Sequence, residues 1–291
     1  MGDDFAMFWV VSGIAWTGLF DPLPEWRHFS PLALAWYKLG FRAFGLDAVG
    51  WHAALMTLFV LATLLVGTCL RAALGLGERP AAMGALFFAS CYAVYEPVAF
   101  VTTSYLLALV LFLLALLAWC KKSGRVSLAL AVAAMLTSEQ AVLFPAMAVL
   151  LDWVRGEVGG WRRYVAPFAL ATLYATAWLA RATSIPAAIS AAPLKTMAGK
   201  LLLLAPYTLC FNQEWLLRGV FSLAHPAWIG LLLWPAALTC LLVARSRPAL
   251  ALAAWILLSL LPVLPRPAST RGISCSARSA WPAPGRWPST R

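Results

Sequence analysis

Residues 51–70 read WHAALMTLFVLATLLVGTCL, a stretch with no Asp, Glu, Lys or Arg. An α-helix needs about 20 apolar residues to cross the hydrocarbon core of a bilayer, so this stretch predicts a membrane-spanning helix. Residues 101–120 (VTTSYLLALVLFLLALLAWC) and 228–243 (WIGLLLWPAALTCLLV) have the same character. A soluble core could hardly hide several such segments. The sequence therefore predicts an all-α fold, a polytopic transmembrane helical bundle.

The composition supports this class. The chain is 63% hydrophobic and 11% charged, with a mean hydropathy of +0.82, whereas soluble domains carry about 25% charged residues. The net charge of +11 raises the question of nucleic-acid binding. We expect no nucleic-acid partner, because the basic residues lie between hydrophobic segments, where they set membrane topology.

The basic residues predict the orientation. Lys and Arg concentrate in short cytoplasmic loops, and four clusters interrupt the apolar segments: Arg71 with Arg79; Lys121, Lys122 and Arg125; Arg155, Arg162 and Arg163; Arg245 with Arg247. If all four are cytoplasmic, an even number of crossings separates each cluster from the next.

The apolar segments satisfy that condition. Residues 49–70 would run inward, and three out-and-back pairs would follow: 80–97 with 100–120, 126–140 with 141–153, and 164–182 with 224–244. Residues 249–265 would then run outward. The pair 126–140 and 141–153 is short, so two interpretations stay open for it, full crossings or a re-entrant hairpin.

This topology divides the chain into three parts. Residues 1–48 form an outer loop, in which 5–20 and 31–45 are expected to be amphipathic surface helices. The transmembrane region covers 49–265. Residues 266–291 (RPASTRGISCSARSAWPAPGRWPSTR) carry five Arg and no acid, and are expected to be disordered. Two interpretations of this tail stay open, an out-of-frame translation or a basic tail that binds anionic headgroups.

Five ionisable side chains fall at the outer boundary in this topology: Asp3, Asp4, His52, Glu96 and Glu139. Ionisable residues in such segments are costly and indicate function by default. The alternative is structural: the carboxylates are solvated or cap helices, and His52 anchors a helix at the interface. The functional interpretation is preferred because all five side chains converge on one face.

Four segments, taken in order, resemble GT-C-type polytopic glycosyltransferases of the protein O-mannosyltransferase-like group, including bacterial relatives. They are DDFAMFW (3–9), HFSPLALAWYKLGFRAFGLDAVGWHAALM (28–56), ALFFASCYAVYEPVAFV (85–101) and LTSEQAVLFPAMAVLLDW (136–153). The resemblance covers roughly residues 3–155. In that group an acidic pair lies in the first outer loop, with a Gly-x-His pair and a Glu-bearing turn after it.

The resemblance implies transfer of a sugar from a polyprenyl-phosphate carrier to an acceptor hydroxyl on the outer face, with inversion. It implies Asp3 or Asp4 as general base, a role that suits a carboxylate within hydrogen-bond reach of the acceptor. His52, Glu96 and Glu139 are the expected substrate-binding residues. Arg27 and Arg42 are candidates for contacting the lipid phosphate. The other outer-side basic residues stay open as candidates, since nothing in the sequence chooses among them: Lys38, Arg181, Lys195, Lys200 and Arg218.

The chain departs from the family pattern at three places. The Ser-Lys-Glu segment reads Thr137-Ser138-Glu139, and VTTSYLL follows Glu96 without the family's Arg and acid. These two departures bear on how the lipid phosphate is held. The family places a transmembrane helix before the acidic pair, whereas this sequence begins at the pair. Together with the tail at 266–291, this predicts a chain truncated at both ends.

The remaining expectations concern partners and alternatives. Six scattered Cys without a C-x-x-C pair are expected to be buried small hydrophobes, and no His/Cys cluster indicates zinc, so neither a metal nor a cofactor is predicted. Expected partners are membrane lipids, the polyprenyl-phosphate sugar and an acceptor. The expected location is a bacterial inner membrane, with the active face periplasmic. Two alternatives stay open: a non-enzymatic membrane protein (a carrier or assembly subunit), or an inactive remnant of the family.

Overall fold

The structure, a computed structural model, describes residues 11–20, 30–90, 104–157 and 159–181, together with Arg247 and Leu250. Within this part of the chain 86% of the residues are helical and there is no strand. The all-α class predicted from the sequence is confirmed for these residues.

Seven α-helices and two 3-10 helices are fully described: η1 (Thr17–Phe20), α2 (Pro31–Phe44), α3 (Ala48–Leu74), α4 (Glu78–Ser90), α6 (Tyr105–Cys120), α7 (Gly124–Thr137), η2 (Glu139–Leu143), α8 (Phe144–Arg155) and α9 (Arg162–Arg181). The inward helix expected over 49–70 is α3, and the short pair expected over 126–140 and 141–153 is α7 and α8, joined by η2.

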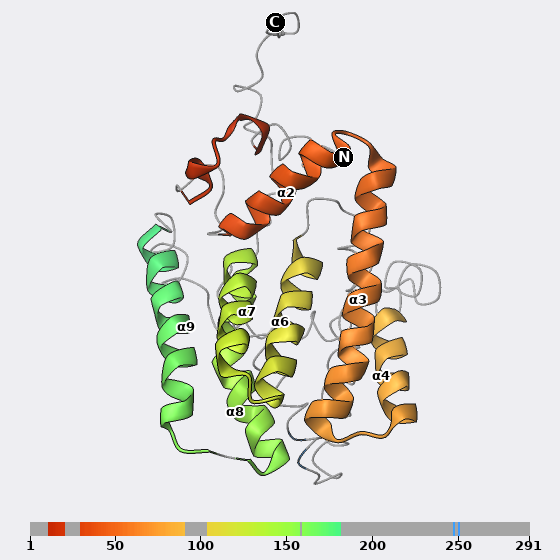
Figure 1. The fold of residues 1–291 in the computed structure, drawn as a ribbon, viewed down its shortest axis with the longest axis vertical. Coiled ribbons are helices and arrows are strands. Elements are labelled where there is room, and N and C mark those ends of the chain that lie inside the picture. The colour runs from red at the N-terminus through yellow and green to blue at the C-terminus, as the bar shows by residue number, and fades with distance from the viewer. Residues whose placement is uncertain are drawn as a thin grey trace, which may run out of the picture.

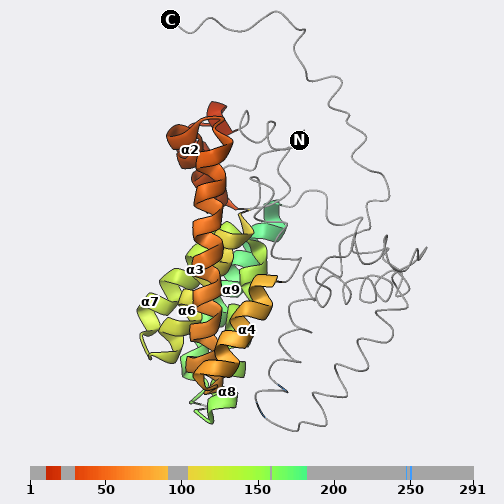
Figure 2. The same ribbon diagram turned by 90° about the vertical axis from the view of Figure 1, so that its right-hand side faces the viewer.

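The helices from α3 to α9 form an antiparallel array (Figure 1). The connections α3–α4, α6–α7 and α8–α9 lie together at one end, which we call the basic end. The other end, which we call the α2 end, is formed by α2, the start of α3 and η2. Seen from the side, α3 runs the length of the array, with α2 at one end and α8 at the other (Figure 2).

Helix α6 is central to the array. Its sequence, YLLALVLFLLALLAWC, is apolar on every face, which is typical of a helix buried all round. One side packs on α3 through Val110 and Leu113. The other side joins the largest core cluster, where Leu116 and Trp119 meet side chains of α7, α8 and α9.

Helix α3 is the one described helix that is long and apolar enough to span a membrane, with 27 residues; α6 and α7 are apolar but shorter. At its start the Asp47 carboxylate accepts hydrogen bonds from the backbone N–H groups of Val49 (3.0 Å) and Gly50 (3.2 Å), which caps the helix. At its end Gly75 adopts φ 65°, the left-handed conformation that favours glycine, and stops the helix.

The surface helix expected over 31–45 is α2. Tyr37 and Gly40 are buried, whereas Leu39 and Arg42 are exposed. Its buried face packs against Trp51 in the first turns of α3, and the ring of Trp51 lies directly on Gly40.

The helix expected over 5–20 is not continuous, which corrects that prediction. Residues 11–13 are helical, residues 14–16 are not, and η1 follows. The physical reason is Lys38 of α2, whose Nζ donates to the carbonyl oxygens of Val11 (3.2 Å) and Ile14. Carbonyls at a helix end need such partners, so Lys38 stabilises the break.

Candidate functional site

The sequence-predicted site divides into two groups. Asp3, Asp4, Arg27 and Glu96 lie outside the described residues. His52, Glu139 and Arg42 are described, and all three lie in the elements of the α2 end.

Glu139 is the first residue of η2, in the turn between α7 and α8 where the sequence predicted it. The turn forms because Ser138 is extended (φ −152°, ψ 135°) and interrupts the helix between Thr137 and Glu139. The carboxylate of Glu139 lies close enough to Tyr174 of α9 for the two groups to interact electrostatically. Glu139 is half-buried and faces α9.

His52 and Arg42 lie in other elements of this end, α3 and α2. His52 is the fifth residue of α3 and is exposed. The guanidinium carbon of Arg42 lies 5.7 Å from the ring centroid of Trp16, and Lys38 Nζ lies 5.4 Å from the same ring. Both cations therefore hold residues 11–20 against α2 through cation–π contacts.

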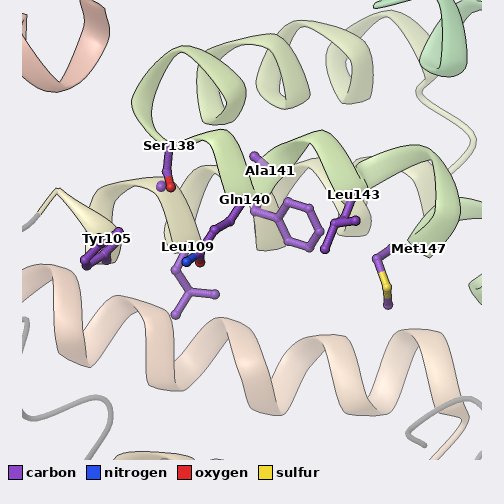
Figure 3. Close-up of a pocket in the computed structure, with 9 residues that line it drawn as sticks. Tyr105, Leu109, Ser138, Gln140, Ala141, Leu143 and Met147 are labelled. Atoms are coloured by element: carbon purple, nitrogen blue, oxygen red, sulfur yellow. The ribbon is translucent and has the colours of Figure 1, made fainter. Parts of the chain in front are cut away.

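A pocket of about 160 Å³ lies beside η2, between α6 and α8, and we call it the η2 pocket (Figure 3). Tyr105, Ser138 and Gln140 line one end, and Leu143 and Met147 line the other. The polar end is at the α2 end of the molecule, because α6 starts there and α7 finishes there. Glu139 does not line the pocket, although both of its neighbours do.

Sequence reasoning missed Ser138 and Gln140 as candidates. A 3-10 turn places successive side chains on different faces, so the carboxylate and its neighbours diverge. The sequence contained the turn but gave no indication of which of its side chains faces a cavity.

The basic end holds a buried carboxyl side chain that the sequence analysis also missed, Asp152 of α8, whose exposed fraction is 0%. Trp119 Nε1 donates to its Oδ1 at 3.2 Å, and the Tyr164 hydroxyl donates to its Oδ2 at 2.8 Å. Arg163 Nη1 lies 3.2 Å from Oδ2, and the Arg163 guanidinium stacks 4.4 Å from the Trp119 ring centroid. We call these four residues the Asp152 cluster.

A second set of contacts lies next to it. Arg155 donates to the carbonyl oxygen of Cys120 (3.0 Å) and to Glu157 Oε1 (3.0 Å), and Lys122 Nζ lies 3.6 Å from Glu157 Oε2. These contacts join the end of α6 to the α8–α9 connection. Asp152 of α8 contacts Trp119 of α6 and both Tyr164 and Arg163 of α9, so we assign the Asp152 cluster a structural role, tying α6, α8 and α9 together.

Three of the four basic clusters identified in the sequence lie at this end, in the connections α3–α4, α6–α7 and α8–α9 or in the helix ends that flank them. Of the fourth cluster the structure describes Arg247, whose Nη1 would lie 3.4 Å from a Cβ at Gly156, in the α8–α9 connection. The described basic residues of these clusters therefore gather at one end of the array.

In the part of the chain that the structure describes, no group of three or more His, Cys, Asp or Glu side chains is placed to hold a metal ion. Both described cysteines, Cys69 and Cys120, are free thiols.

Comparison with known proteins gives no match. No protein-family model, no curated protein and no solved structure matches this chain.

Proposed function

We propose that this chain is a polytopic membrane glycosyltransferase that moves a sugar from a polyprenyl-phosphate carrier to an acceptor hydroxyl on the outer face, with inversion. The observation that carries the proposal is that the Glu139 turn and His52 lie at the end of the array opposite the basic connections. The sequence resemblance assigns substrate binding to these residues, and the positive-inside rule makes their end the outer one.

Membrane insertion is supported by the surface of α3. Only 17% of its most apolar 18-residue segment is buried, and its exposed large apolar side chains lie along one side of the helix: Val49, Met56, Val60, Leu61 and Leu64. At 1.5 Å per residue, 27 residues reach about 40 Å, enough to cross a hydrocarbon core of about 30 Å.

Further support comes from the hydroxyls of α3. Thr57, Thr63 and Thr68 each donate to the carbonyl oxygen four residues earlier, at 2.8, 2.9 and 2.8 Å. A hydroxyl satisfied in this way needs no water, so these residues are tolerated on a helix in lipid.

In the proposed reaction, the acceptor oxygen forms a bond to the anomeric carbon while the bond from that carbon to the phosphate oxygen breaks. The carboxylate of Asp3 or Asp4 takes the hydroxyl proton, and the lipid phosphate leaves with the bonding electrons. Arg27 and Arg42 are the proposed contacts for its growing negative charge. His52, Glu96 and Glu139 are the proposed contacts for the sugar and acceptor. The proposed location is a bacterial inner membrane, with this end in the periplasm.

The test is a transfer assay on membranes that contain the protein and a labelled polyprenyl-phosphate hexose. Substituting the base, in Asp3→Asn and Asp4→Asn, is expected to reduce transfer by about 100-fold or more in one of the two variants. Glu78→Gln, which removes an exposed carboxylate at the basic end, is the matched control and should transfer like wild type. Full transfer in both Asn variants would exclude the proposed base, and no transfer by wild type would favour a non-enzymatic protein.

A further inference from the structure

The η2 pocket is polar at one end and apolar at the other. Tyr105, Ser138 and Gln140 gather at the α2 end, whereas Leu143, the last residue of η2, and Met147 of α8 lie at the other end (Figure 3). A ligand that matches this layout has a hydrogen-bonding group at one end and a hydrocarbon chain that runs toward the middle of the array.

Ser138 supplies the most specific feature of the pocket. It is 4% exposed, and its Oγ has no hydrogen-bond partner among the residues that the structure describes. Its backbone is fully paired, since the N–H donates to Ala134 O (2.8 Å) and the carbonyl accepts from Ala141 N (3.1 Å). The hydroxyl does not cap η2 either. Figure 3 shows it turned toward Leu109 and Gln140.

Two other buried hydroxyls, both in α7, behave differently. Ser127 Oγ donates to Ala115 O at 2.8 Å, and Thr137 Oγ1 donates to Ala133 O at 2.8 Å. A buried polar group without a partner is costly, so an unpaired hydroxyl at Ser138, beside a pocket, points to an acceptor supplied from outside the chain.

The chemistry of the lining limits that acceptor. No charged side chain lines the η2 pocket, and a phosphate there would lack a counter-charge. The acceptor is therefore an uncharged oxygen. The apolar end accommodates only a short length of chain, because a cavity of about 150 Å³ is large enough for one benzene ring.

The position along α7 identifies the source. Ser138 directly follows the last residue of α7, at the α2 end. If the α2 end is the outer end, as proposed, Ser138 lies on the side of the outer headgroups, and the ester carbonyl of a glycerolipid is the uncharged oxygen that joins those headgroups to hydrocarbon. An ester carbonyl is an uncharged acceptor with a hydrocarbon chain attached, which matches both ends of the pocket.

We propose that the η2 pocket binds an ester-linked acyl chain of a membrane lipid, with Ser138 Oγ–H donating to the ester carbonyl and the first methylenes lying against Leu143 and Met147. This inference rests on the proposed membrane location of the chain and is independent of sugar transfer.

The test compares two lipids that differ only in the carbonyl. The delipidated, detergent-solubilised full chain is titrated with dipalmitoyl phosphatidylcholine or with its dihexadecyl ether analogue, and bound lipid is counted by native mass spectrometry. The zwitterionic headgroup is chosen so that the basic end does not attract it. Wild type is expected to bind the ester lipid about fivefold more tightly than the ether lipid, the effect of one net hydrogen bond.

Three variants assign the effect. Ser138→Ala is expected to bind both lipids equally, and Ala141→Phe, which fills the pocket, to bind both weakly. Ser90→Ala removes an exposed hydroxyl that donates to Phe87 O on α4, and should keep the wild-type preference. Equal binding of the two lipids by wild type, or an unchanged preference in Ser138→Ala, would overturn the proposal. Ser138→Ala decides the matter even if Ala141→Phe does not fold. Because the lipid titration needs no sugar donor, its result does not depend on whether the transfer assay detects activity.

Discussion

At the scale of single residues, several polar groups in the described part of this apolar chain are satisfied by partners within the protein. The threonines of α3 use their own helix, whereas Asp152 draws partners from two other helices, Trp119 of α6 and both Arg163 and Tyr164 of α9. Burying such a carboxylate is tolerated only while all of its partners are in place. If one partner is removed, the buried charge is left uncompensated and the fold is destabilised.

We predict that Asp152→Ala lowers the free energy of unfolding by about 3–5 kcal/mol, because it strands the Arg163 guanidinium and two buried donors. The measurement is denaturant-induced unfolding in detergent, followed by tryptophan fluorescence. Glu78→Ala is the control: it breaks the Arg71–Glu78 ion pair (3.1 Å), whose side chains are 56% and 81% exposed, and should cost about 1 kcal/mol or less. Similar losses in the two variants would show that the Asp152 cluster does not tie the helices.

At the scale of elements, the corner between α2 and α3 depends on close approach. Trp51 Nε1 donates to the carbonyl oxygen of Gly45 at 3.1 Å, and the Trp51 ring meets Phe44 edge-on with centroids 5.8 Å apart. A Cβ at Gly40 would lie 2.2 Å from the Trp51 ring. The absence of a side chain at Gly40 is therefore what lets α2 lie on the start of α3.

We predict that Gly40→Ala destabilises the fold by about 1–3 kcal/mol, because the buried Trp51 ring must move to admit the methyl group. Gly124→Ala is the matched control, since nothing lies within 4 Å of a Cβ there, and alanine at this first residue of α7 should leave stability unchanged or raise it. Thermal unfolding of both variants checks the difference. Equal midpoints would mean that the α2–α3 contact contributes little.

At the scale of the whole molecule, the basic connections gather at one end, and the Glu139 turn and His52 lie at the other. The proposed function depends on this polarity. If the α2 end is the outer end, the residues that the family resemblance assigns to substrate binding lie on the face where a polyprenyl-linked sugar would be used. The reverse orientation would place them on the wrong face.

We predict that, in a cysteine-free background, Leu46→Cys reacts with a membrane-impermeant maleimide in intact cells, whereas Ser123→Cys reacts only after permeabilisation. Both positions are exposed, one before α3 and the other in the α6–α7 connection. The physical reason is that Lys and Arg loops stay on the cytoplasmic side. The opposite pattern would reverse the orientation and remove the sugar-transfer proposal.

The helices themselves were largely predictable. Their positions follow from the local sequence, because apolar runs locate the helices and polar or glycine residues mark where each helix begins and ends. The ends of α3, at Asp47 and Gly75, show this directly, since each is set by a capping residue within the segment. The exception is the segment 11–20, whose helix stops because Lys38, more than 20 residues away, pairs with its carbonyls.

Composition and local pattern therefore dictated the helical class, the approximate helix bounds and the gathering of the basic connections, because each depends on residues close together along the chain. Tertiary structure alone decided that Asp152 pairs with Arg163 and that Ser138, not Glu139, faces the η2 pocket. Those outcomes depend on how each helix is rotated about its axis, and that rotation is fixed by packing between segments whose relative orientation no local pattern encodes.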